Sequence, residues 1–305
     1  MKDDRKRTII TDRLNSESET IPFDDSELIL PGSSRVELSD SISIRRKDNK
    51  EGGYISDLRQ VLMGAVRKTR ADAVMVSGGI DSSVLAVLAD SVRRDTELCV
   101  AGFGDSEDVA AAGVLARDLG KDVLVAEMDD ESLMKSMAEL KRAGLYSYNL
   151  IMGATEYAAV KALRDKGRRT VISGIGSDEL FFGFYRHRKM PREALADFRD
   201  RRLAYMNATD LLRLNTVGKV LNAKLYYPYL EENVIDYALG LDLNELTKNF
   251  DKSLLRALGQ ELGLSEFIVK RKKKAMQYGS GVVDRIELLS KRGGYKTVGE
   301  FIEGI

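Results

Sequence analysis

The stretch Ala-Val-Met-Val-Ser-Gly-Gly-Ile-Asp-Ser-Ser, residues 73–83, decides the fold of this chain. Its first four residues are apolar and predict a buried strand, which stops at Ser-Gly-Gly. Apolar side chains then recur at helical spacing and predict a helix over residues 82–93. The sequence therefore predicts a strand, a tight glycine turn and a helix N-terminus.

The turn has the properties of a phosphate-binding site. The first N–H groups of a helix have no partner within the helix, and the helix dipole adds positive potential there. Gly78 and Gly79 let the backbone approach an anion closely and adopt a positive φ. Ser77, Ser82 and Ser83 add hydroxyl donors. The plain alternative is a serine-capped glycine turn that binds no ligand.

Asp81 stands out because a carboxylate repels phosphate. A divalent cation between the two groups removes the conflict, since Mg²⁺ binds one or two carboxylates together with phosphate oxygens. The pattern is not a Walker A loop, because no Gly-Lys-Ser/Thr follows. The sequence thus predicts Mg²⁺ beside a phosphate-bearing ligand, with Asp81 as a metal ligand.

Composition limits the classes of function. Lys+Arg and Asp+Glu both number 48 in 305 residues, so net charge gives no argument for a nucleic acid or a membrane partner. Cys99 is the only cysteine, which excludes an internal disulfide and a cysteine-based zinc site. The N-terminus is charged and no apolar run reaches membrane-spanning length. We therefore expect a cytoplasmic protein.

Three regions are expected: a polar arm over 1–53 with a small hairpin at 26–44, a nucleotide-binding core over 54–190, and a helical part over 191–305. The predicted strands are 73–76, 97–103, 122–127 and 170–173. The predicted helices are 54–70, 82–93, 108–119, 130–143, 151–166, 200–214, 232–239 and 252–262. Alternating strands and helices indicate an α/β fold, a parallel twisted sheet covered by helices on both faces.

A second glycine turn, Ser173-Gly174-Ile175-Gly176-Ser177-Asp178-Glu179, follows the fourth predicted strand. Ligands bind at the carboxyl ends of parallel strands. We therefore expect the two turns to face each other across a cleft, with Asp81 and Asp178 sharing one or two magnesium ions. The alternative is that Asp178 and Glu179 simply cap the next helix.

Three further features of the sequence lead to expectations. Asp108 is expected to cap the helix over 108–119. His187, the only histidine, lies between two arginines and is expected at the surface. The basic run 268–277 either supplies a lysine to a triphosphate, or is a solvated face, or is a weak nucleic-acid patch without interleaved aromatic residues.

In order and spacing these motifs resemble the C-terminal synthetase domain of class B asparagine synthetases. Its fold is shared with β-lactam synthetase among the PP-loop ATP pyrophosphatases, which are adenine nucleotide α-hydrolase-like. The resemblance spans residues 71–281. It rests on 77–83, Asp108, 173–183, Pro228-Tyr229-Leu230, Lys252-x-x-Leu-Arg256 and Arg271-x-Lys273.

The resemblance implies ATP and Mg²⁺ as cofactors, and a ligase that adenylates a small-molecule carboxylate, releases pyrophosphate and forms an amide. By resemblance, the catalytic residues are Lys273, Asp178 and Asp81, of which the two aspartates bind magnesium. The implied nucleotide-binding residues are Val76, Ser77, Gly78, Gly79, Asp81, Ser82, Ser83, Ala101, Ser173, Gly174, Lys252, Arg256 and Lys273.

The chain departs from this family at several positions. Ile175 stands where the family has glutamate or tyrosine, and isoleucine neither accepts nor donates a proton. Lys224-Leu225-Tyr226 replaces the family's Glu-x-Arg, and Glu231 replaces its aspartate. No cysteine follows Met1, so we expect the amine to be free ammonia, the product of a separate glutaminase subunit, or another amine.

Two other functions stay open, together with a homodimeric state. One is a PP-loop enzyme that modifies RNA, for which the basic run 268–277 is the only support. The other is a non-catalytic, ATP-binding regulatory protein, which Ile175 permits.

Overall fold

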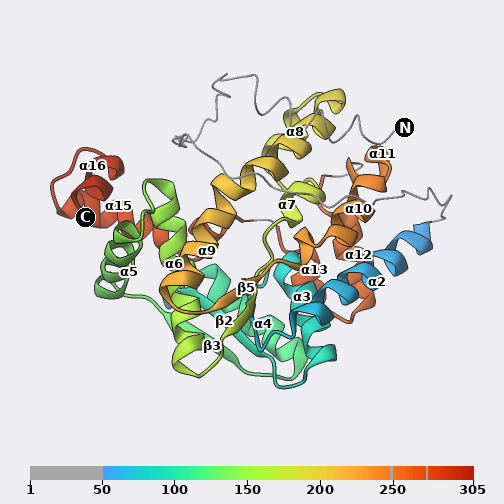
Figure 1. Cartoon of the computed structure of the whole chain (residues 1–305), viewed down its shortest axis with the longest axis horizontal. Coiled ribbons are helices and arrows are strands. Elements are labelled where there is room, and N and C mark those ends of the chain that lie inside the picture. The colour runs from blue at the N-terminus through green and yellow to red at the C-terminus, as the bar shows by residue number, and fades with distance from the viewer. Residues whose placement is uncertain (1–50, 248–249, 273) are drawn as a thin grey trace.

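A five-stranded sheet with the order β3-β2-β1-β4-β5 forms the centre of the computed structural model, which describes residues 51–247, 250–272 and 274–305 (Figure 1). The strands are β1 Ala73–Met75, β2 Glu97–Gly102, β3 Val123–Glu127, β4 Thr170–Ile172 and β5 Lys224–Tyr226. Every pairing in it is parallel, which confirms the predicted α/β fold. The hairpin predicted at 26–44 lies outside the described residues.

Helices alternate with the strands and continue after them. The first are α2 Glu51–Thr69, α3 Ile80–Val92, α4 Glu107–Leu119, α5 Asp130–Arg142, α6 Tyr148–Asp165, α7 Ser177–Leu180, α8 Arg192–Tyr205 and α9 Asp210–Val220. After β5 come α10 Glu232–Gly240, α11 Leu243–Thr247, α12 Ser253–Glu261, α13 Glu266–Lys270, α14 Met276–Gly279, α15 Val282–Arg292 and α16 Val298–Gly304. The 3₁₀ helices are η1 Tyr185–Lys189, η2 Met206–Ala208 and η3 Pro228–Leu230.

Each face of the sheet has its own hydrophobic core. Alternate strand residues point to opposite faces, so Val74 and Leu98 pack with α2, α3, α4 and α12, whereas Ala73 and Cys99 pack with α5, α6 and α15. Figure 1 shows α2, α3 and α12 to one side of the sheet and α5 and α6 to the other. Because α12 and β5 follow residue 190, the part over 191–305 shares its hydrophobic core and its sheet with the part over 54–190.

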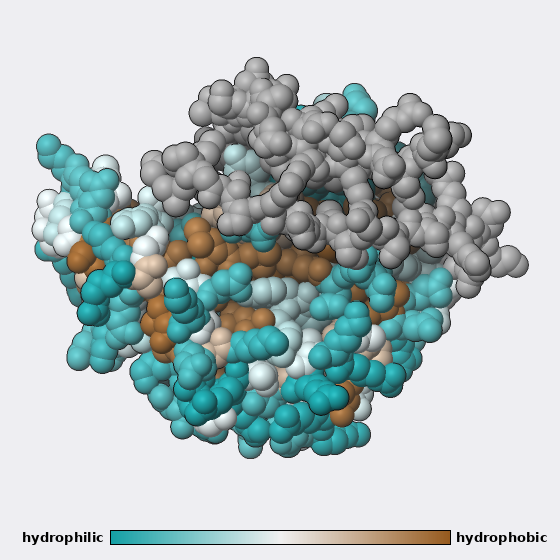
Figure 2. All heavy atoms as spheres, viewed as in Figure 1, coloured by the Kyte–Doolittle hydropathy of each residue, from teal (hydrophilic) through white to brown (hydrophobic). Residues whose placement is uncertain are grey.

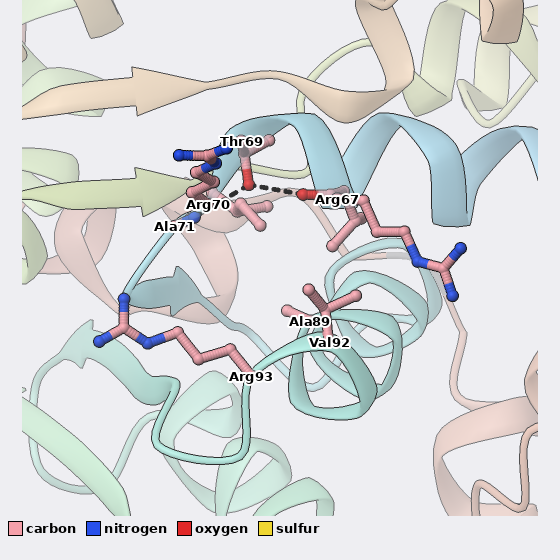
Figure 3. A pocket seen from close by; sticks show the side chains of 9 residues that line it. Arg67, Thr69, Arg70, Ala71, Ala89, Val92 and Arg93 are labelled. Carbon is pink, nitrogen blue, oxygen red and sulfur yellow. Dashed lines mark hydrogen bonds between the residues drawn. The ribbon is translucent and has the colours of Figure 1, made fainter.

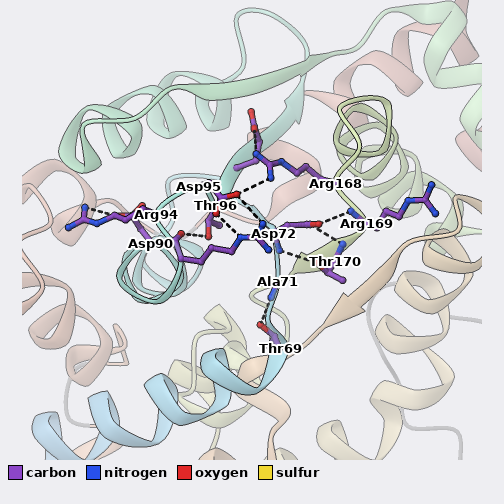
Figure 4. Close-up of polar contacts among 12 residues, drawn as sticks. Thr69, Ala71, Asp72, Asp90, Arg94, Asp95, Thr96, Arg168, Arg169 and Thr170 are labelled. Carbon is purple, nitrogen blue, oxygen red and sulfur yellow. Dashed lines mark hydrogen bonds and ion pairs between the residues drawn. The ribbon is translucent and has the colours of Figure 1, made fainter.

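Polar contacts at the start of β1 set its register against β4 (Figure 4). The Asp72 carboxylate accepts hydrogen bonds from the backbone N–H groups of Arg169 at 3.2 Å and Thr170 at 3.0 Å. The N–H of Asp72 donates to the Thr170 hydroxyl at 3.0 Å. These contacts align the two strands at their amino ends, and so place the two turns at their carboxyl ends side by side.

Two sequence-based predictions of secondary structure are wrong in the C-terminal part. The part over 191–305 is predicted to be helical, yet β5 in it pairs with β4 from Thr170–Lys224 to Ile172–Tyr226. A strand of this length carries too little pattern to be recognised, and its partner strand determines it. The helix predicted over 200–214 is the end of α8 and the start of α9, separated by η2. No glycine or proline marks that break in the sequence.

In Figure 2, which has the orientation of Figure 1, an apolar band crosses the middle of the surface above a mostly hydrophilic lower part. Leu212 and Val220 of α9 are among the exposed apolar side chains. Within the described residues, no helix combines the length and the apolar character needed to cross a membrane.

Gly78 is required at its position for two reasons. Its φ of +65° is left-handed, and a Cβ atom there would lie 2.5 Å from the Cβ and carbonyl carbon of Ala111 in α4. The first glycine turn therefore packs directly against α4, and only glycine permits that approach.

We expect Gly78→Ala to lower the free energy of unfolding by about 2–4 kcal/mol, because left-handed alanine costs about 1–2 kcal/mol and the clash with Ala111 adds to it. Gly64→Ala, at an open position within α2, is the matched control and should raise it by about 0.5–1 kcal/mol. Urea unfolding measures both, and equal effects would contradict the assigned role of Gly78.

Candidate active site

The first glycine turn is held by its own serines. The N–H of Ser77 donates to the Ser82 hydroxyl at 3.2 Å, and this hydroxyl donates to the carbonyl of Gly79 at 3.2 Å. Helix α3 begins at Ile80, earlier than the predicted start at residue 82, with Gly79 as its N-cap. The hydroxyls thus fix the path of the chain between β1 and the first turn of α3.

The second glycine turn lies against the first. A Cβ at Gly174 would lie 3.5 Å from the backbone nitrogen of Ser82, which is van der Waals contact. Gly176, with φ +94°, faces Leu230 of η3, where a Cβ would lie 2.5 Å from the leucine side chain. The prediction that both turns meet at one edge of the sheet is therefore confirmed. They follow β1 and β4, where the strand order reverses direction, the usual place for a ligand in such sheets.

Lys252 joins the two turns. Its ammonium lies 2.6 Å from Oδ2 of Asp81 and 2.6 Å from Oδ1 of Asp178, and donates to the hydroxyl of Ser177 at 3.1 Å. The lysine side chain is 3% exposed. The two aspartates predicted to share a metal therefore converge on one cation. Neither caps its helix, because neither α3 nor α7 has a side-chain cap.

Arg271 ties the C-terminal basic run to the first turn. Its guanidinium donates to the carbonyl of Ser77 at 2.6 Å and to Oδ1 of Asp108 at 2.8 Å. The expectation that Asp108 caps α4 is wrong, since Ser106 occupies the cap position and the buried Asp108 pairs with Arg271 instead. Gly279 makes room for this pair, because a Cβ there would lie 2.3 Å from an Asp108 oxygen.

Arg256 binds the backbone of the same basic run. Its guanidinium donates to the backbone carbonyls of Asp251 at 2.6 Å, Arg271 at 3.0 Å, and Val269. Its predicted contact with phosphates stays a prediction. Lys273, the predicted catalytic lysine, lies outside the described residues. It follows Arg271 by two positions in the sequence.

The remaining basic residues of this run are largely occupied by acids. Lys274 pairs with Glu107 at 2.7 Å, and Lys270 pairs with Glu266. Lys272 is exposed. Two lysines of the run are therefore paired with acids, and whether the run binds nucleic acid stays a prediction.

Replacing Arg271 should weaken the fold strongly. Arg271→Met removes a cation that pairs with the buried Asp108 carboxylate, so we expect a loss of about 3 kcal/mol in the free energy of unfolding. The control is Lys274→Met in the same segment, whose ion pair is exposed and should contribute less than about 1 kcal/mol. Similar losses in both variants, measured by urea unfolding, would refute the anchoring role of Arg271.

A buried chain of charges that the sequence analysis missed lies behind the second turn. Arg213 donates to both oxygens of Glu156 at 2.9 and 3.1 Å, and to Asp210 at 2.9 Å. Arg202 lies 3.2 Å from Glu179 and 3.4 Å from Asp210. The chain thus joins α6, α9, α8 and α7. The Asp210–Arg213 spacing of three on one helix was the only available sequence signal.

Two other buried groups next to the turns were not predicted as functional. The Tyr229 hydroxyl donates to the backbone carbonyl of Asp81 at 3.0 Å, and burial raises the pKa of this phenol well above its usual value. Burial, and then the charge of neighbouring Asp178, raise the pKa of Glu179 to about 7. Tyr229 therefore acts as a neutral donor that holds the start of α3, and Glu179 titrates near neutral pH.

The expectation that His187 lies at the surface is wrong. It is fully buried, its Nδ1 accepts from the N–H of Phe184 at 3.2 Å, and the rings of Phe182, Phe184 and Phe198 surround it. Burial lowers the pKa of His187 to about 4. The charge of two flanking arginines does not determine the direction of the side chain between them. The 3₁₀ helix η1 directs His187 into the core.

His187 predicts a pH dependence of stability. The unfolded chain binds a proton near pH 6.5 and the folded chain only near pH 4, so the free energy of unfolding falls as pH falls between these values. We expect wild type to lose about 2 kcal/mol relative to His187→Phe between pH 7 and pH 5. Other titrations, including that of Glu179, cancel in this difference. A difference that does not change with pH would disprove the neutral, buried histidine.

Two cavities in the described part of the chain lie away from these carboxylates. One, of about 240 Å³, lies at the other end of α3, where Thr69, Ala89 and Val92 line it together with Arg67, Arg70 and Arg93 (Figure 3). Another, of about 210 Å³, lies along α8 and includes Phe198 and Arg202.

The residues at the two turns fit a magnesium ion held together with phosphates. Asp81 and Asp178 direct their carboxylates at one position, which a cation, the Lys252 ammonium, occupies. Among the described residues no cluster of three or more His, Cys, Asp or Glu could hold a metal by itself. Such a pair of carboxylates suits Mg²⁺, which takes its other ligands from phosphate oxygens and water.

Comparison with known proteins is decisive for the family. A sequence profile of the family described as asparagine synthase matches residues 57–213 and 191–291. The chain belongs to the asparagine synthase family. This family is the one that the glycine turns and the later motifs resemble, so that resemblance is confirmed.

Individual relatives of this asparagine synthase family member are distant. The protein described as glutamine-hydrolysing asparagine synthetase 1 of Methanocaldococcus jannaschii is 26% identical in an alignment 345 positions long. This alignment covers 96% of this chain and 63% of that protein. The glutamine-hydrolysing asparagine synthetase of Gallus gallus is 26% identical over 249 residues, which cover 75% of this chain and 44% of that protein. This chain thus spans less than two thirds of the length of either relative.

One solved structure is also similar. The NMN synthetase from Francisella tularensis is 17% identical, with a TM-score of 0.41, over 84% of this chain and 87% of that one. This similarity is too low to carry an argument.

Proposed function

We propose that this chain is an ATP-dependent ligase that adenylates a carboxylate and forms an amide, with AMP and pyrophosphate as products. The observation that carries the proposal is the convergence of Asp81 and Asp178, from two glycine turns, on one cation position. Membership of the asparagine synthase family supports the ATP-dependent part. The proposed cofactors are ATP and Mg²⁺.

The proposed reaction has two steps. A carboxylate oxygen of the substrate attacks the α-phosphorus of ATP, the bond to the β-phosphate breaks, and pyrophosphate leaves. An amine nitrogen then attacks the acyl carbon and loses a proton, and AMP departs with the electron pair of the broken C–O bond. Bound Mg²⁺ would neutralise charge on the phosphate oxygens.

The chain's own residues have distinct proposed tasks. The first turn, with Ser77 to Ser83, binds the phosphates at the N-terminus of α3. Ser173 and Gly174 border the nucleotide from the second turn, and Val76 and Ala101 flank its base. Lys273 stabilises charge that develops at the α-phosphate. Arg256 and Arg271 hold the chain that precedes Lys273, because Arg256 donates to the carbonyl of Arg271 and Arg271 donates to the carbonyl of Ser77.

The amine donor and the acceptor belong to the same proposal. Ile175 offers no proton-accepting atom, so the proton of the attacking amine passes to another base or to water. Aspartate and ammonia are the first substrates to test. A separate glutaminase subunit, a homodimeric assembly and a cytoplasmic location stay predictions.

Release of pyrophosphate and AMP from Mg²⁺·ATP tests this function, first with aspartate and ammonia and then with a pool of cellular carboxylates and with tRNA. We expect Asp81→Asn and Lys273→Ala each to lower the rate about 100-fold or more, because they remove a metal ligand and a charge that stabilises the transition state.

The matched control is Asp165→Asn, at an exposed ion pair with Lys161 at the end of α6, which should leave the rate unchanged. Pyrophosphate release that persists in Asp81→Asn would exclude this aspartate from the reaction. Turnover with tRNA alone would favour RNA modification, and nucleotide binding without turnover on any substrate would favour a regulatory protein.

A further inference from the structure

The ammonium of Lys252 occupies the point at which the two turns direct their carboxylates. It donates hydrogen bonds to Asp81 at 2.6 Å and to the Ser177 hydroxyl at 3.1 Å, and it forms an ion pair with Asp178 at 2.6 Å. The surroundings are shaped for this contact. At Gly183 a Cβ would lie 2.1 Å from Cε of Lys252 and 2.0 Å from Oδ1 of Asp178, so any larger residue would expel the lysine.

We propose that Lys252 is a placeholder cation, which holds the two carboxylates together in the nucleotide-free protein and gives them up only when Mg²⁺ arrives with a triphosphate. The lysine then transfers to the phosphates. This inference rests on the proposed function for the identity of the nucleotide. It adds that the protein without nucleotide binds the metal only weakly, so that tight metal binding requires the nucleotide.

Charge and the number of available ligands both disfavour a metal ion at the two carboxylates when no nucleotide is bound. The ammonium contacts the same carboxylates that would bind the metal. Because the Lys252 side chain is only 3% exposed, its charge is poorly screened and would strongly repel a divalent cation beside it. Two carboxylates also provide few ligands for Mg²⁺. A triphosphate removes both obstacles, because it supplies oxygen ligands to the metal and a new anionic partner to the lysine.

The backbone holds Lys252 ready for this exchange. Lys252 is the N-cap of α12 with φ +60°, and Phe250 has φ +49°, both left-handed values that non-glycine residues rarely adopt. This turn directs the lysine away from its own helix and toward the pair of aspartates. Its four-carbon side chain can move the ammonium to an adjacent phosphate while the backbone stays in place.

The test is Mn²⁺ binding to the full chain without nucleotide, followed by electron paramagnetic resonance of free Mn²⁺. We expect Lys252→Met to bind one Mn²⁺ roughly tenfold or more tightly than wild type, because the variant keeps both carboxylates and removes the competing charge. Adding Asp178→Asn to that variant should abolish the gain. Lys121→Met, which removes a lysine that pairs with Asp90 on the same helix as Asp81, is the matched control and should bind Mn²⁺ like wild type.

A measurement on wild type alone covers the case in which Lys252→Met does not fold. Wild type should bind Mn²⁺ weakly by itself and at least tenfold more tightly with α,β-methylene-ATP, which the proposed reaction cannot cleave. Tight Mn²⁺ binding to wild type without nucleotide, or no gain in folded Lys252→Met, would overturn the inference. Failure of the proposed function looks different, since it would leave the gain in Lys252→Met intact and abolish AMP release with every substrate.

Discussion

The parallel pairing of β1 with β4 is the constraint on which the rest of the site depends. Asp72 aligns the amino ends of these strands through the backbone of Arg169 and Thr170, and the carboxyl ends then bring the two glycine turns into contact at Gly174 and Ser82. Strand order reverses between them, so no loop has to cross the edge on which they lie. Two short turns, about a hundred residues apart in the chain, thereby become one surface.

Charge is buried around these turns to an unusual degree. Lys252 pairs with Asp81 and Asp178, Arg271 pairs with Asp108, and Arg202 and Arg213 pair with Glu179, Asp210 and Glu156. Buried ion pairs contribute little net stability because desolvation offsets their attraction, yet loss of one partner is severe. We interpret these pairs as devices that hold the turns in one arrangement.

The C-terminal part contributes to the site through contacts rather than through a separate binding unit. β5 extends the sheet next to β4, and Tyr229 of η3 donates a hydrogen bond to the backbone carbonyl of Asp81. Lys252, which joins the two turns, is the N-cap of α12. Arg256 and Arg271 then hold residues 269–271, which precede the predicted catalytic lysine in the sequence, against the first turn. The family match across residues 57–291 fits a site built from both parts.

Much of the fold could be predicted because local patterns carry it. The strands β1 to β4, the helices between them and the two glycine turns follow from apolar periodicity, from glycine and from serine, which act over a few residues. His187, the break between α8 and α9, and β5 could not be predicted, because their burial or pairing depends on distant residues. The same holds for Asp108, whose partner Arg271 lies 163 positions away.

By itself the sequence determined that two strand–turn–helix units carry serine, glycine and aspartate, and that their order matches the asparagine synthase family. Only the tertiary structure decided which groups share a site. It placed Lys252 between Asp81 and Asp178, although 171 residues separate the lysine from the first aspartate. The physical reason is that hydrogen bonding within turns and helices is local, whereas the pairing of buried charges depends on which chain segments the packed sheet brings together.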